Sequence, residues 1–187
     1  MSTDTSTVTL PKAGTYTIDK AHTVVGFVAR HLVGTKVRGQ FADFDGSFTV
    51  AEPVEKSSLQ AVAQAASITT GVSMRDDHLR TNDFLDAPNF PTITVTSTGL
   101  TKVTDEEWKL AADLTIRGVT EPVVFDLEFL GTGPSMQEGK EVVAFSASTE
   151  IDRRDFGVSF NHSLLDGSVA VGHKVRIELE VEASLQD

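Results

Sequence analysis

The sequence contains no cysteine, no long apolar run and few basic residues relative to its acidic ones. Without cysteine, its 187 residues cannot form disulfides, a thiol nucleophile or a thiolate metal site. No run of about 18 apolar residues occurs, so no segment is suited to span a membrane as a helix. Lys and Arg number 16 against 27 Asp and Glu, a formal net charge of −11. The chain as a whole therefore repels nucleic acids and anionic membranes, although this total leaves room for a local basic patch.

The beginning of the chain lacks the features of a secretory leader. Residues 1–13 are rich in Ser and Thr, and no basic stretch is followed by an apolar one. We expect a flexible polar tail over residues 1–13 and a single domain over residues 14–187. The predicted location is cytoplasmic, and the mature form of a secreted protein is the alternative.

Sequence motifs for catalysis and metal binding are also missing. There is no Gly-x-Ser-x-Gly elbow and no glycine-rich phosphate loop that opens a helix. The five histidines contain no pair with the spacing of two or four residues that places metal ligands on one face of a strand or helix. We therefore predict no metal site and no catalytic residue. A hydrolase or isomerase acting on a hydrophobic substrate through His22 or His78 and a nearby acid is an alternative.

Apolar and polar residues alternate with a period of two over much of the chain. The clearest case is the segment from Lys174 to Ala183, in which apolar residues alternate with charged ones. Similar alternation runs through residues 108–117, 123–129 and 143–151. Four such strands in succession indicate antiparallel pairing, with one face of the sheet in the core.

The first half of the chain is also rich in predicted strands, but the pattern is less regular. Inward positions change parity between Phe41 and Phe44, which predicts a β-bulge near residues 42–43. The glycines of this stretch fit a sharply coiled strand or a tight corner. One segment breaks the strand pattern and predicts a short helical insertion around residues 74–86, capped by Ser73 and ended before Pro88.

Breaker-rich loops are expected over residues 53–57, 131–140 and 166–172, with a tight hairpin at Gly118. Seven or eight strands in one domain fit a sandwich or a closed barrel. Long strands, a bulge and glycines within strands favour the barrel, so we expect an all-β, antiparallel barrel of seven or eight strands. Small residues on the inward face would leave room for a slender ligand, but the 11 phenylalanines could also fill the interior. Alternation alone does not choose between these two outcomes.

Five blocks of sequence carry a resemblance to a known family. They are TYTIDKAHTVVGFVARHL (15–32), VRGQFADFDGSF (37–48), RDDHLRTNDFLDAPNFPTITVTS (75–97), LTIRGVTEPV (114–123) and RRDFG (153–157). In this order they resemble the YceI-like family of lipocalin-like, polyisoprenoid-binding proteins. The resemblance implies an eight-stranded barrel whose apolar pore houses a long isoprenoid chain, such as a polyprenyl quinone or a polyprenyl phosphate. It also implies a homodimer and no catalytic activity.

The expected function is non-enzymatic binding, storage or transport of a long-chain isoprenoid lipid, with no catalytic cofactor. The expected partners are this lipid, a second copy of the chain and, transiently, a membrane. A scaffold or stress-response interaction module is a further alternative. The candidate pore-lining residues are Phe27, Ala29, Phe41, Phe44, Phe48, Phe84, Ile93, Val95, Ala112, Leu114, Phe125, Phe145, Ala147 and Phe156. The candidates for contact with a lipid head group are His22, Arg75, His78 and Arg154.

Overall fold

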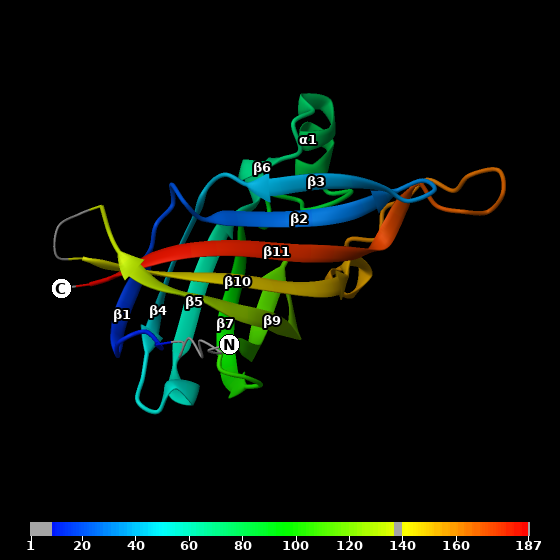
Figure 1. Cartoon of the computed structure of the whole chain (residues 1–187). Coiled ribbons are helices and arrows are strands. Elements are labelled where there is room, and N and C mark those ends of the chain that lie inside the picture. The colour runs from blue at the N-terminus through cyan, green and yellow to red at the C-terminus, as the bar shows by residue number, and fades with distance from the viewer. Residues whose placement is uncertain (1–8, 137–139, 187) are drawn as a thin grey trace, which may run out of the picture.

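The computed structural model describes residues 9–136 and 140–186, which are mostly strands joined by short turns (Figure 1). The strands are β1 (Gly14–Ile18), β2 (Val24–His31), β3 (Thr35–Phe41), β4 (Phe44–Val50), β5 (Ser58–Gln64), β6 (Ile68–Thr69), β7 (Thr92–Lys102), β8 (Glu107–Ile116), β9 (Val119–Pro134), β10 (Glu141–Asp152) and β11 (Val171–Leu185). The helices are α1 (Ser73–Arg80) and the 3₁₀ turns η1 (Val54–Lys56), η2 (Ala65–Ser67) and η3 (Arg153–Phe156). The described residues include no helix with the length and apolar character needed to cross a membrane.

The strand segments combine into eight antiparallel strands because three of the eight are interrupted. The first interrupted strand consists of β1 and β2, which pair with the two ends of β11. The second consists of β4, which pairs with β1, and β3, which pairs with β2. The third consists of β5, which pairs with β4, and β6, which pairs with β3. β7 to β11 follow as a meander, and the pairing of Ile18 with Ala183 closes the ring. The prediction of a closed eight-stranded antiparallel barrel is therefore confirmed.

The parity change between Phe41 and Phe44 is produced by a corner rather than a bulge. β3 ends at Phe41 and β4 begins at Phe44, and the two residues between them bend the chain. Asp43 accepts a hydrogen bond at 2.8 Å from the backbone N–H of Gln64, which holds the corner against the next strand. The corner lets both phenylalanines face the interior. Bulges occur elsewhere, at Ser97 in β7 and between Ala144 and Phe145.

Several predicted boundaries shift because strand pairing overrides local turn chemistry. β9 continues to Pro134 and pairs with β10, so only the end of the loop expected over residues 131–140 is irregular, and residues 137–139 lie outside the described residues. The hairpin at Gly118 forms as predicted. Arg117 and Gly118 have φ of 50° and 73°, the left-handed pair of a type I′ turn.

The helical insertion also forms, but it is held by Asp76 instead of a cap from Ser73. Ser73 is the first helical residue, and the preceding Val72 offers no side-chain cap. Asp76 is only 5% exposed. It accepts hydrogen bonds from the Thr70 hydroxyl at 2.6 Å, the Thr70 N–H at 2.8 Å and the Thr69 hydroxyl at 3.2 Å. Burial raises the pKa of Asp76, but these hydrogen bonds outweigh it and lower the pKa below its ordinary value. They tie α1 to β6 at one end of the barrel.

Candidate ligand cavity

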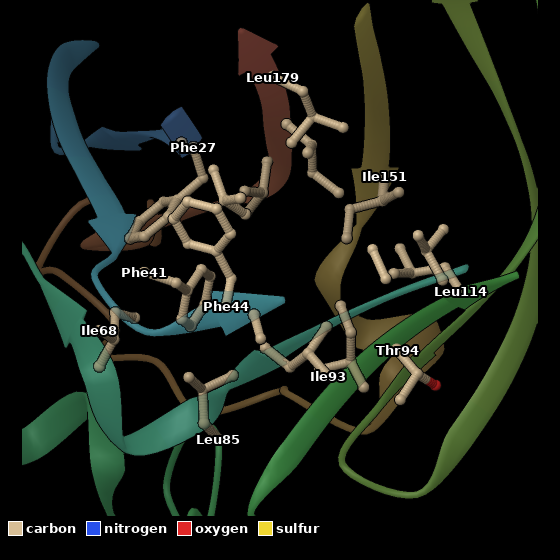
Figure 2. A pocket seen from close by; sticks show the side chains of 18 of the residues that line it. Phe27, Phe41, Phe44, Ile68, Leu85, Ile93, Thr94, Leu114, Ile151 and Leu179 are labelled. Carbon is tan, nitrogen blue, oxygen red and sulfur yellow. The ribbon is translucent and has the colours of Figure 1, made fainter. Parts of the chain in front are cut away.

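The interior of the barrel holds a cavity of about 250 Å³. The inward side chains of β11 form one wall of it, because every second residue from Val175 to Val181 points to the axis. Figure 2 shows labelled side chains from several other strands, among them Phe27, Ile93 and Leu114, converging on the same space. Leu79 and Leu85, from α1 and the turns after it, also line the cavity.

The wall of this cavity is almost entirely hydrocarbon. Among its described lining residues, only Thr23, Asp45, Thr94 and Arg153 carry polar side chains. Thr23 donates its hydroxyl proton to the backbone carbonyl of Glu182 at 3.2 Å, so this group is satisfied without a ligand. A cavity of this kind attracts a ligand by burying carbon surface and offers little orientation to a polar substrate.

A second cavity of about 120 Å³ adjoins the first. Its walls include Leu10, Pro11, Trp108 and Phe129. Five side chains line both cavities, so together they form the partition between them: Leu59, Val95, Phe125, Leu179 and Val181. Many of the described buried apolar residues pack in four separate clusters around these spaces. The phenylalanines therefore do not fill the barrel from end to end.

Part of the expected N-terminal tail belongs to this wall. Residues 1–8 lie outside the described residues, but Leu10 and Pro11 line the second cavity. The Tyr16 hydroxyl donates to the backbone carbonyl of Lys12 at 2.9 Å and holds this segment against β1.

The structure brings thirteen of the fourteen candidate pore-lining residues to the two cavities. Ten line the larger cavity: Phe27, Ala29, Phe41, Phe44, Phe84, Ile93, Val95, Leu114, Phe125 and Phe156. Phe48, Phe145 and Ala147 line the smaller one. Ala112 lines neither, because it is packed against its neighbours in a cluster with Phe125 and Ala147. Contact of these residues with a ligand stays a prediction.

None of the four head-group candidates lines either cavity. His22 Nδ1 lies 2.9 Å from Asp19 Oδ2 and 3.8 Å from Glu182 Oε1. The hydrogen bond with Asp19, followed by the charges of Asp19 and Glu182, raises the pKa of His22 above its ordinary value. His22, Asp19 and Glu182 are exposed or half-buried, and each offers one atom that could bind a metal ion. These three atoms lie within 4.8 Å of one another.

The other three candidates are engaged in local hydrogen bonds. Arg75 Nε donates to the Thr70 hydroxyl at 2.7 Å, and His78 Nε2 lies 2.8 Å from Asp83 Oδ2. Arg154 donates to both carboxylate oxygens of Asp152. These three residues stabilise turns outside the cavity. The sequence did not reveal this, because alternation identifies the face of a strand but does not identify these local partners.

Among the described residues that line the larger cavity, the one cation is Arg153, whereas the sequence prediction named Arg154. Arg153 is 6% exposed. It donates to the backbone carbonyls of Val158 at 2.7 Å, Gly172 at 3.0 Å and Val171 at 3.4 Å. Burial lowers the pKa of its guanidinium below the ordinary value. The sequence contained a signal for the inward position of Arg153. The inward-facing residues of β10 are every second residue through Ile151, and the next residue in this series is Arg153.

Comparison with known proteins gives a consistent result. The sequence profile of the YceI-like domain matches residues 16–183. UPF0312 protein SA2479 of Staphylococcus aureus is 33% identical over 92% of this chain and 98% of its own length. The crystal structure of the Campylobacter jejuni YCEI protein is 30% identical, covers 84% of this chain and 90% of its own, and superposes with a TM-score of 0.72. A polyisoprenoid binding domain from Saccharophagus degradans is 16% identical over 94% of this chain and 100% of its own, with a TM-score of 0.69, and shares the fold.

Proposed function

The chain belongs to the YceI-like domain family, and we propose that its barrel binds a long-chain isoprenoid lipid for storage or transport, without catalysing a reaction. The observation that carries the proposal is the pair of adjoining cavities with hydrocarbon walls. The proposal covers polyprenyl quinones and polyprenyl phosphates, because their tails share the same chemistry.

Burial of carbon surface is the interaction that such a wall can supply. A polyisoprenoid tail has no polar groups along its length, and each buried CH₂ contributes about 0.8 kcal/mol. Even a few isoprene units would therefore bind, less the free energy needed to order the tail. A cavity of roughly 150 Å³ holds one benzene ring, so the larger cavity at about 250 Å³ accommodates only part of a long tail. A longer tail requires the partition between the two cavities to open.

Catalysis by histidine is not favoured by the geometry. In the described part of the chain, no histidine lines either cavity. His22 and His78 each have a carboxylate partner, but both pairs lie outside the cavities and are open to solvent. A hydrophobic substrate held in the barrel would not meet them. We therefore propose a binding protein and not a hydrolase or isomerase.

Organic extraction of the purified protein, followed by mass spectrometry, tests the proposal. We expect the extract to contain a polyprenyl compound at close to one molecule per chain. The extracted protein should then bind isoprenoid alcohols of increasing length, with affinity rising until both cavities are filled. A protein that neither releases such a compound nor binds any member of this series would contradict the proposal.

A further inference from the structure

Two hairpin turns lie side by side at one end of the barrel and expose apolar side chains. The first is the β2–β3 turn, and the second is formed by residues 161–170, which precede β11 (Figure 1). The backbone N–H of Leu32 donates to the carbonyl of Ala170 at 2.9 Å and joins the two turns. The exposed large apolar residues of the turns are Leu32, Val33, Leu164 and Leu165.

The exposure of these residues follows from the shape of the turns. Val33 and Leu165 are fully exposed. The second hairpin is closed by two backbone hydrogen bonds, from the N–H of Leu164 to the carbonyl of Ser168 at 2.8 Å and from the N–H of Gly167 to the carbonyl of Leu164 at 3.0 Å. Single exposed apolar residues are common, but four on two adjacent turns at one end of the barrel are a feature of interaction surfaces. The turn formed by residues 161–170 is held at its base, because Phe160 packs against Phe84 and His78.

The strands directly behind these tips are basic, in a chain that is strongly acidic overall. Residues 30–38 contain three cations and no acid, and residues 159–176 contain two cations and Asp166 as their one acid. Arg30, Lys36 and Arg38 are exposed and form no salt bridge within the described ranges, while Lys174 lies opposite Asp152. We call the exposed residues Leu32, Val33, Leu164 and Leu165, together with Arg30, Lys36, Arg38 and Lys174, the basic tip.

The charge changes sign with distance from the basic tip. Along the outward face of β11, Lys174 and Arg176 are followed by Glu178, Glu180 and Glu182. The remainder of the molecule therefore carries the excess of negative charge. Near an anionic surface, this distribution attracts the basic tip and repels the opposite end, so it fixes an orientation.

From this combination we propose that the basic tip docks on an anionic lipid bilayer. The apolar side chains enter the boundary between head groups and acyl chains, and the cations lie among the anionic head groups. A second copy of the chain would bring the same cations face to face in a symmetric contact, which their repulsion opposes. Docking also places Ala29 and Val171, which line the larger cavity, within a few residues of the bilayer. The inference does not depend on the barrel being loaded with lipid.

Vesicle flotation at low ionic strength tests the docking. We expect the full chain to float with phosphatidylcholine vesicles that contain about a third phosphatidylglycerol, and to stay behind with phosphatidylcholine alone. The double variant Val33→Asp/Leu165→Asp and the variant Lys36→Glu/Arg38→Glu should each lower vesicle affinity at least about tenfold. Added salt should weaken wild-type binding, because the cations are exposed.

The matched control is Met136→Asp, which alters a fully exposed apolar residue at the opposite end of the barrel and should bind as the wild type does. Circular dichroism confirms that each variant folds. Equal flotation with both vesicle types, or unchanged flotation of both double variants, would overturn the proposal. It would also be overturned if sedimentation showed a wild-type dimer that Val33→Asp/Leu165→Asp dissociates while neither protein floats, because the partner would then be a second copy.

Discussion

The ring of Phe27 covers the α-carbon of Gly39, its antiparallel partner on β3. A β-carbon at position 39 would lie 2.3 Å from Cζ of Phe27 and 2.9 Å from Cγ2 of Thr70. The absence of a side chain at Gly39 therefore lets Phe27 lie flat against the wall of the larger cavity. The position of the Phe27 ring in the wall of the larger cavity therefore depends on Gly39.

Gly39→Ala should displace the Phe27 ring into the cavity. We expect a destabilisation of about 1–3 kcal/mol from the forced repacking, and a reduced amount of bound isoprenoid per chain. Urea unfolding followed by Trp108 fluorescence measures the first effect, and quantitative extraction measures the second. Gly99→Ala is the matched control, because a β-carbon there would meet nothing closer than Ala111 at 3.9 Å. Equal behaviour of the two variants would show that Phe27 is not held by Gly39.

β11 illustrates what alternation in a sequence can predict. Strict alternation in β11 placed Val175, Ile177 and Leu179 on the inward face, and they line the larger cavity. The barrel followed from the number and length of such strands. A hollow interior could not be derived in this way, because it depends on how each ring tilts over its neighbours.

The alternation of apolar and polar residues also could not predict the local partners of charged residues. Arg153 and Arg154 are adjacent and chemically identical, but η3 directs Arg153 toward the barrel. It leaves Arg154 exposed and hydrogen-bonded to Asp152. Asp76 holds α1 through Thr69 and Thr70, which precede it by six or seven residues, and no capping pattern identifies such bonds. Strand parity was the one usable signal, and it pointed to Arg153.

Ala147→Trp should block the smaller cavity. Ala147 lines this cavity beside Phe145 on β10, and an indole side chain there would occupy the space. We expect binding of a long polyprenyl chain to fall at least about tenfold, the equivalent of roughly 1.4 kcal/mol, while a short isoprenoid that fits the larger cavity binds as before. Titration with farnesol and with a long polyprenol distinguishes the two.

The control for this variant is Ala144→Trp, on the outward parity of the same strand, which should bind both ligands normally. Ala112→Trp is not a suitable substitute, because Ala112 is fully packed and a larger side chain there would disturb folding. If the Ala147 variant bound long and short chains as the wild type does, the smaller cavity would have no role in binding.

Asp19→Asn should lower the pKa of His22. The hydrogen bond and charge of Asp19 raise the pKa of His22 above about 6.5, and His22 in turn lowers the pKa of Asp19 below its ordinary value. The ion pair therefore adds stability while His22 is protonated and Asp19 ionised. His22's contribution is complete below its unfolded pKa and is lost as the pH rises through its folded pKa, while that of Asp19 is lost as the pH falls through its folded pKa.

An NMR titration of the His22 ring measures the shift directly. Glu182→Gln is the comparison, because Glu182 lies at 3.8 Å and should have a smaller effect than Asp19. The wild type should gain stability as the pH falls through the folded pKa of His22, and Asp19→Asn should lose most of this gain. An unchanged titration of His22 in Asp19→Asn would contradict the assignment.

Arg153→Met should destabilise the barrel more than Arg154→Met. The guanidinium of Arg153 joins η3 to the start of β11 and to Val158 through three backbone carbonyls. Methionine would remove this donor from all three, although the carbonyl of Val171 would keep its bond from Asn161 Nδ2 at 2.6 Å. We expect a loss of about 2–3 kcal/mol in the free energy of unfolding, because the bond to Val158 is buried and the other two are partly buried. Arg154 is exposed and, among the residues that the structure describes, its side chain bonds only to Asp152, so its loss should cost less than about 1 kcal/mol. Urea unfolding of both variants measures the difference, and equal midpoints would mean that the buried guanidinium does not hold this end of the barrel together.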